Sequence, residues 1–408
     1  MCDVVVIVGP GVTADAGLLG EVARREFAAL GVRGRVEHAR DAAQQRALMR
    51  EEPVVVVAPA PSAEAQTLIR QPPGTGVVVP VDLDRVEGAL HIHGRGIGGL
   101  AWGIRHAVHR ARYPGVRRVA YGPAAEQWGD LYLPETGVKV PVVVLVHGGY
   151  WRSEWAADLM EGLCEDLVGR GFAVWNLEYR RPDRHGWAAT KQDVAAGLAA
   201  LHGLGPATVP GPALAGEVTG PDVLTGTAAV PGPGKAADPA AARHVLLDLD
   251  RIAVAGHSAG AQLALRAVAD GARAAVAVSL AGVLDLAEAD RRWLSHGAVA
   301  AALRGPQGEA AVSGAQGEAA APDDTSPQAE LRASDPLLRL PLGIPQIVVQ
   351  GRSDDINLVD ISRRYAEAAH EAGDHVTYLD LPGDHQDVIT PATPIWQATA
   401  AALTAALT

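Results

Sequence analysis

Residues 253–260 read Ala253-Val254-Ala255-Gly256-His257-Ser258-Ala259-Gly260, and the organisation of the whole chain follows from them. An apolar run, residues 252–255, precedes the Gly-x-Ser-x-Gly pattern, and a helix-forming run, residues 261–269, follows it. In a strand–turn–helix setting, the small residues beside the serine permit a sharp, strained turn that lifts its hydroxyl clear of the sheet edge. The sequence therefore predicts that Ser258 is a nucleophile. The alternative interpretation is an incidental glycine-rich turn.

A serine hydroxyl is a poor nucleophile at neutral pH, so it needs a base and an orienting acid. Residues 345–350 form an apolar run that leads into Gly351-Arg352-Ser353-Asp354-Asp355, and a late strand of this kind commonly carries the acid at its end. We expect Asp354 to be that acid, with Asp355 as the fallback; the alternative is that both only cap the next helix. His385, on a loop after the last expected strand, is the expected base.

The loop His147-Gly148-Gly149-Tyr150 follows another apolar run, residues 142–146. A loop in this position supplies one N–H group of an oxyanion hole, and the residue after the nucleophile supplies the other. We expect the N–H of Gly149, or that of Tyr150, to act together with the N–H of Ala259. His147 and Gly148 belong to the motif loop, and His147 is expected to be structural rather than a second base.

Two tryptophans close to these motifs, Trp151 and Trp187, are candidates for lining an aromatic-accepting substrate pocket. Packing in the core or in a lid explains them nearly as well.

The first 112 residues alternate short Val-rich runs with amphipathic stretches. This alternation predicts a small, flavodoxin-like, doubly wound α/β domain. The glycines of residues 94–99 also fit Gly-x-Gly-x-x-Gly, but a dinucleotide fingerprint belongs after the first strand of such a fold, and here it precedes the last helix. No cofactor is therefore expected.

The order of these elements, and the ending His93-Gly94-Arg95-Gly96-Ile97-Gly98-Gly99-Leu100-Ala101-Trp102, resemble the type II dehydroquinase family. Residues 11–20 contain neither the Tyr nor the Arg of that family's catalytic loop. Residues 59–65 lack its catalytic His. The resemblance therefore implies a degenerate relative that is retained for structure or binding.

With 408 residues, the chain exceeds one ordinary domain. Tyr113-Pro114-Gly115 breaks the first pattern, so domains are expected at 1–112 and 117–408. Residues 203–241 and 305–328 are rich in Gly, Pro and Ala with little apolar periodicity, and they are expected to be flexible insertions on surface loops.

The formal charge of −12 argues against nucleic acid or an anionic membrane as a partner. Two cysteines cannot form a disulfide framework, which suits a cytoplasmic protein. No spacing of His and Cys indicates a zinc site, so no metal is expected. The expected partner is a small-molecule ester or amide substrate. Whether the chain forms a homo-oligomer stays open.

Residues 117–400, without the two insertions, resemble the α/β-hydrolase esterases. The motifs that carry this resemblance are residues 147–152, residues 256–260, Asp354 and His385. Within that family, Tyr150-Trp151 after His-Gly-Gly is similar to the kynurenine formamidase (arylformamidase) branch. The resemblance implies an α/β-hydrolase fold and a serine hydrolase for a small aryl-formamide or ester, with N-formylkynurenine as the first candidate.

This chain departs from the branch's usual pattern at residues 356–359 and at Gln386, which leaves the triad intact but bears on the substrate. Two other functions compete with this interpretation. One is a general carboxylesterase. The other is a binding or scaffold protein that uses the N-terminal domain.

Overall fold

The structure is a computed structural model of the 408-residue chain. It describes residues 3–59, 62–73, 76–82, 84–86, 91–135, 139–204, 207–209, 243–306 and 327–407. The chain divides into two compact units, which are taken separately below. Unit 1 comprises Met1–Gly115 and Pro210–Arg243, and unit 2 comprises Val116–Val209 and His244–Thr408.

Unit 1 is built on a parallel sheet with the strand order β2-β1-β3-β4-β5. Its strands are β1 (Asp3–Val8), β2 (Arg33–His38), β3 (Val54–Ala58), β4 (Val77–Asp82) and β5 (Ile92–His93). Its helices are α1 (Ala16–Leu30), α2 (Ala42–Glu51), α3 (Ala63–Arg70) and α4 (Gly98–Arg112). This strand order is that of flavodoxin-like folds, as the sequence predicts.

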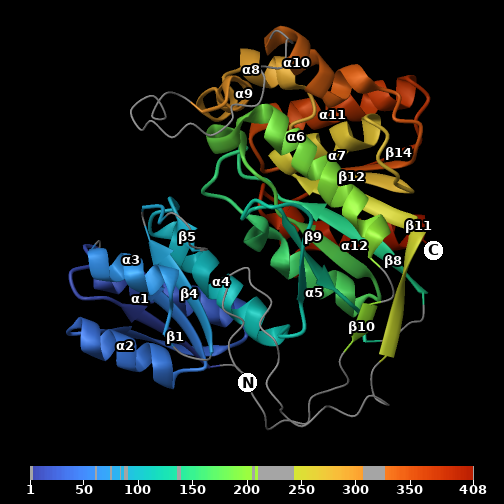
Figure 1. Cartoon of the computed structure of the whole chain (residues 1–408). Coiled ribbons are helices and arrows are strands. Elements are labelled where there is room, and N and C mark those ends of the chain that lie inside the picture. Colours follow the sequence, from blue (N-terminus) through green and yellow to red (C-terminus); the bar gives the residue numbers. More distant parts are fainter. Residues whose placement is uncertain are drawn as a thin grey trace. The chain divides into compact units, whose positions relative to one another are not determined.

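The Val-rich strands of unit 1 are buried on both faces of the sheet. Val4, Val6 and Val8 of β1 belong to a core that includes residues of α1 and α4. The intervening Val5 and Ile7 belong to a second core with residues of α2 and α3. Because side chains alternate between the faces of a strand, helices cover both faces of this sheet (Figure 1).

Unit 2 contains a sheet in the order β14-β13-β12-β11-β8-β9-β7-β6, with β10 paired to β11 beside it. Its strands are β6 (Arg117–Ala120), β7 (Trp128–Tyr132), β8 (Lys139–Val146), β9 (Ala173–Leu177), β10 (Ala207–Val209), β11 (Arg243–His257), β12 (Val276–Leu280), β13 (Gln346–Gly351) and β14 (Val376–Leu381). The pairings of β6 with β7 and of β7 with β9 are antiparallel. From β9 through β8 to β14 the sheet is parallel.

The helices of unit 2 fill the connections between these strands. The α-helices are α5 (Glu161–Gly169), α6 (Pro182–Ala200), α7 (Ala259–Ala269), α8 (Leu286–Arg291), α9 (Ala298–Arg304), α10 (Pro327–Ser334), α11 (Ile356–Glu371) and α12 (Pro394–Leu407). The 3₁₀ helices are η1 (Ala157–Met160), η2 (Leu201–Gly203), η4 (Leu294–His296), η5 (Pro336–Arg339) and η6 (Asp387–Ile389).

The central strands of unit 2 are apolar because helices pack on both of their faces. Val142, Val144 and Val146 of β8 lie in the main core, together with residues of α6, α7 and α11. Val143 and Leu145, also inaccessible to solvent, alternate with them and point to the opposite face. Figure 1 shows α5 and α12 on that side of the sheet.

α6 is interrupted by a kink at Gly186, which has a φ of 81° and a ψ of 158°. Glycine adopts this conformation readily, so two helical segments join there at an angle. The predicted insertions, 203–241 and 305–328, lie mostly outside the described residues, although 207–209 form β10.

Every predicted catalytic motif follows a strand of the parallel part of the sheet. Ser258 follows β11, the His147 loop follows β8, Asp354 follows β13 and His385 follows β14. Because the carboxyl ends of parallel strands share one edge, these residues lie at the same edge of the sheet, where open α/β sheets bind ligands.

Candidate active site

Ser258 occupies a strained turn between β11 and α7. Its φ is 54° and its ψ is −120°, a combination that is rare for a residue with a side chain. Its backbone N–H donates to the carbonyl oxygen of Leu280, at 2.9 Å, which ties the turn to the end of β12. The turn is therefore held by the neighbouring strand, and backbone strain of this kind is typical of functional positions.

The two glycines of the motif are required by close packing. A Cβ atom on Gly256 would collide with the backbone of Gly260 one turn later. A Cβ atom on Gly260 would collide with the carbonyl oxygens of Val146 and His147. Both contacts are with backbone, which cannot rotate away as a side chain can. Glycine at these positions thus lets the Ser258 turn lie directly against the loop after β8.

Asp354 and His385 form a close pair. His385 Nδ1 donates to Asp354 Oδ2 at 2.8 Å, and the Asp354 side chain is only 4% exposed. Burial alone would raise the pKa of Asp354, but the hydrogen bond and charge of His385 outweigh it and hold that pKa below its usual value. The carboxylate therefore stays ionised and fixes the ring through Nδ1, so that Nε2 is the nitrogen that can act as a base.

Asp355 has a different role. Its side chain accepts the N–H of Asn357 at 2.8 Å and caps the N-terminus of α11. Of the two acids considered from the sequence, Asp354 is the one that contacts His385.

His257 is a site residue for which the sequence analysis predicted no role. Its Nε2 donates to the backbone oxygen of His385 at 3.1 Å, and the two rings lie 4.7 Å apart. Burial, with a further contribution from His385, lowers the pKa of His257 to about 3. The ring is therefore neutral at physiological pH and ties the His385 loop to the residue that precedes Ser258.

The loop after β8 approaches Ser258 through its backbone. A Cβ atom on Gly148 would lie 2.6 Å from the His257 oxygen and 2.9 Å from Ser258 Cβ. Gly149, Tyr150 and Trp151 then have φ values of 108°, 53° and 58°. This run of positive φ turns the chain sharply beside the serine. The predicted oxyanion-hole residues Gly149, Tyr150 and Ala259 thus lie on the two segments that flank Ser258.

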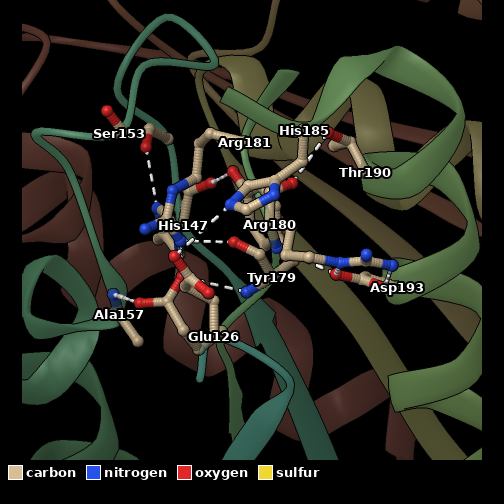
Figure 2. Close-up of polar contacts among 12 residues, drawn as sticks. Glu126, His147, Ser153, Ala157, Tyr179, Arg180, Arg181, His185, Thr190 and Asp193 are labelled. Carbon is tan, nitrogen blue, oxygen red and sulfur yellow. Dashed lines mark hydrogen bonds and ion pairs between the residues drawn. The ribbon is translucent and has the colours of Figure 1, made fainter. Parts of the chain in front are cut away.

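A buried network of charged and polar residues supports the loop after β8 through contacts with His147 (Figure 2). Glu178, directly after β9, accepts hydrogen bonds from His147 Nε2 at 3.1 Å, from the Ala157 N–H at 3.0 Å and from Arg181. Tyr179 Oη donates to the backbone oxygen of His147 at 2.8 Å. The side chain of His147 thus contacts Glu178 and its backbone contacts Tyr179, and its structural role stays a prediction.

Charge pairing keeps Glu178 ionised in this buried setting. Burial would raise its pKa, but Arg181 and His147 outweigh that effect and lower the pKa to about 2. The Arg181 guanidinium is itself buried, so each of the two charges depends on the other. In the sequence, the only trace of this network is the run of polar residues from Glu178 to Arg181 directly after β9.

A cavity of about 400 Å³ lies beside the loop, within the size range of small-molecule sites. Its walls are Tyr150, Trp151, Arg152, Asp183, Ala298, Ala301, Ala302, Arg304 and Gly305. Trp151 thus lines a cavity, while its indole Nε1 donates to Gln262 Oε1 at 3.1 Å.

Trp187, the other predicted pocket residue, does not line this cavity. It is 6% exposed, and its Nε1 donates to Glu330 Oε1 at 2.9 Å and to Ser334 Oγ at 3.1 Å. It packs edge-on to Trp151 and borders only a narrow apolar gap. The structure therefore supports the packing interpretation of Trp187.

The described part of the chain contains no group of three or more His, Cys, Asp and Glu side chains arranged to hold a metal ion. Within the same ranges, no helix combines the length and the apolar character needed to cross a membrane.

Comparison with known proteins bears on unit 2. The BD-FAE family model matches residues 130–202, which include the His147 loop and Glu178. The bifunctional GH43-CE protein of Bacteroides eggerthii has a similar structure, with 17% identity and a TM-score of 0.50 over 72% of this chain and 35% of that chain. The chain has an α/β-hydrolase fold.

Other solved structures with this α/β-hydrolase fold resemble the chain to a similar degree. A bacterial heroin esterase is 20% identical, with a TM-score of 0.49 over 75% of this chain and 90% of its own. Thermogutta terrifontis esterase 2 is 18% identical, with a TM-score of 0.47 over 71% and 92%. At these identities the likeness concerns the fold alone. No curated protein gives a significant match.

The α/β-hydrolase fold expected from the sequence is therefore confirmed. The similarities to the kynurenine formamidase branch and to type II dehydroquinase stay predictions.

Proposed function

We propose that this protein is a serine hydrolase that cleaves a small ester or aryl-formamide, with Ser258, His385 and Asp354 as its triad. The observation that carries this proposal is the 2.8 Å hydrogen bond between Asp354 and His385. It is joined to the strained Ser258 turn by the contact of His257 with His385. A nucleophile, a base and an acid in this chain order are typical of α/β-hydrolases.

In the proposed reaction, Ser258 Oγ attacks the substrate carbonyl carbon while His385 Nε2 accepts the hydroxyl proton. Asp354 holds the imidazole and stabilises the imidazolium that forms. The N–H groups of Ala259 and of Gly149 or Tyr150 receive the oxyanion of the tetrahedral intermediate.

When the intermediate collapses, His385 returns the proton to the leaving alcohol or amine. Water, deprotonated by the same imidazole, then attacks the acyl-enzyme, and the acid product leaves with Ser258 restored.

The finer substrate assignment is an aryl-formamide, with N-formylkynurenine as the first candidate. It is supported by the Tyr150-Trp151 pair after His-Gly-Gly and by the position of both aromatic side chains on the cavity wall. A general carboxylesterase is the second candidate, favoured by the BD-FAE match over residues 130–202. A cytoplasmic location and the absence of nucleic-acid and membrane partners stay predictions from the sequence.

Hydrolysis of N-formylkynurenine should be measured beside that of short-chain p-nitrophenyl esters, with the wild type and Ser258→Ala. Ser62→Ala, which changes an exposed serine of unit 1, is the matched control. Formamide cleavage that is lost only in Ser258→Ala would support both mechanism and substrate. Ester cleavage alone would support the carboxylesterase. No Ser258-dependent activity would overturn the proposal in favour of a binding protein.

A further inference from the structure

We infer that the cavity beside the His147 loop selects substrates that carry a carboxylate group, held by Arg152 and Arg304. This inference rests on the proposed function, because it names the substrate class of the same site. It goes beyond that function in making a carboxylate a requirement of the substrate class and in naming the two residues that bind it.

The cavity is linked to Ser258 by the loop after β8. The Gly148 backbone packs against Ser258 Cβ, and Tyr150, which lines the cavity, comes two residues later. Two peptide units span at most about 7.6 Å between Cα atoms, so a small molecule can reach from the cavity to the serine. A substrate whose carbonyl group lies at Ser258 can therefore place its far end among the residues of the cavity wall.

The arginines of this wall differ from most others in unit 2. Arg118, Arg180, Arg181 and Arg292 each pair with a buried or half-buried carboxylate. In the described part of the chain, neither Arg152 nor Arg304 forms an ion pair. Among the described residues, the Arg152 guanidinium has a long, 3.5 Å contact with the Ser295 oxygen and lies 5.9 Å from the centre of the Tyr150 ring.

One carboxylate, that of Asp183, also lies on the cavity wall. Its Oδ2 accepts the N–H of Ser153 at 2.8 Å, so it is held by the backbone of the loop. Two guanidinium groups against one carboxylate leave the lining with a net charge of one positive unit (2 − 1). A free guanidinium at the edge of a cavity can bind a carboxylate through two parallel hydrogen bonds.

The rest of the lining suits the uncharged part of such a substrate. Trp151, Ala298, Ala301 and Ala302 form apolar wall, and Tyr150 adds an aromatic ring. The matching substrate class is a monoester or formamide whose hydrocarbon or aryl portion ends in a carboxylate. Neutral esters of the same size fill the apolar part but leave both guanidinium groups without a partner.

Two pairs of esters of matched size test this inference. The first pair places the charge on the acyl side: mono-p-nitrophenyl glutarate against p-nitrophenyl pentanoate. The second places it on the leaving group: 4-acetoxybenzoate against phenyl acetate. For at least one pair, we expect the wild-type ratio of kcat/KM, anionic over neutral, to exceed that of alkaline hydrolysis roughly tenfold.

Substitution of the arginines should remove this preference. The ratio is expected to fall toward that of alkaline hydrolysis in Arg152→Gln and Arg304→Gln, and Arg304→Lys should retain part of it. Arg273→Gln, at an exposed arginine paired with Asp250, is the matched control and should keep the wild-type ratio. Calorimetry gives a second readout: the binding of glutarate and benzoate is measured with Ser258→Ala. We expect this binding to be lost when either Gln substitution is added to Ser258→Ala.

The outcomes separate this inference from the proposed function. Ser258-dependent hydrolysis without anionic preference in either pair, or a preference unchanged in both Gln variants, would overturn the inference and leave the hydrolase proposal standing. Absence of Ser258-dependent hydrolysis would overturn the hydrolase proposal and, with it, the inferred substrate class. If carboxylates then still bound in an arginine-dependent manner, the cavity would be a binding site of another kind.

Discussion

His257 Nε2 donates to the backbone oxygen of His385 at 3.1 Å, and the two imidazole rings lie 4.7 Å apart. The residue before the candidate nucleophile therefore holds the loop of the candidate base. Because burial lowers the pKa of His257 to about 3, this hydrogen bond does not change across the neutral range.

The buried, neutral His257 should make the protein less stable in acid. An unfolded histidine titrates near 6.5, so the unfolded state binds more protons than the folded state between about pH 3 and 6.5. Stability should therefore rise with pH through this window and be fully present above it. Glu178 also makes the folded state less stable as the pH falls, but only between about pH 4.5 and 2. The free energy of unfolding, measured with urea from pH 4.5 to 6.5, should thus rise less steeply with pH in His257→Gln than in the wild type. Equal slopes would mean that His257 is protonated in the folded state.

Gly260 should tolerate no side chain. Its Cβ atom would collide with the carbonyl oxygens of Val146 and His147, so Gly260→Ala must displace backbone at the centre of the site. We expect a loss of roughly 3 kcal/mol or more in the free energy of unfolding, together with lost hydrolysis. Gly169→Ala is the control, because a Cβ atom there meets nothing within 4 Å at the end of α5. Thermal or urea unfolding of the two variants measures the difference; similar values for both would contradict the close packing described here.

Asp354 and Asp355 should respond differently to the same substitution. Asp354→Asn removes the carboxylate that orients His385, and we expect kcat to fall on the order of a thousandfold or more, with little change in stability. Asp355→Asn should stay near wild type in both properties, because asparagine caps a helix about as well as aspartate. Steady-state kinetics of both variants on one ester settle the assignment. Loss of turnover in Asp355→Asn with retention in Asp354→Asn would reverse it.

Glu178→Gln should destabilise unit 2 by roughly 3–5 kcal/mol, because it leaves the buried Arg181 guanidinium without its partner. It should also lower kcat more than it raises KM, since Glu178 acts on the site through His147 rather than by touching the substrate. Glu288→Gln is the control, because Glu288 pairs with two arginines of which one is exposed and the other half-exposed. We expect it to change stability and kcat little. A stable Glu178→Gln enzyme with normal kcat would show that the network does not position the loop.

The sequence was most informative where local chemistry determines local structure. The apolar runs before Ser258, His147 and Asp354 predicted strands β11, β8 and β13, because buried parallel strands are apolar throughout. The glycines beside Ser258 predicted a tight turn for the same kind of local reason. Of the two acids named from the sequence, the structure places Asp354 against His385.

The remaining features depend on contacts between segments far apart in the chain. No element was predicted over residues 286–304, where α9 supplies one wall of the cavity. The carboxylate of Glu178 accepts from His147 and from Arg181, and the role of His257 depends on a residue 128 positions later. Periodicity and spacing cannot register such contacts. Trp187 illustrates the same limit, because its hydrogen bond to Glu330 spans 143 residues.

The positive φ values of Gly149, Tyr150 and Trp151 have a consequence for protein engineering. Tyrosine and tryptophan do not favour this backbone region, so the loop keeps its shape only while Glu178, Tyr179 and Arg181 support it. Residues 147–152 are therefore not a transferable module. Grafted alone onto another scaffold, they would relax toward negative φ, and a working transplant would have to carry the end of β9 along with them.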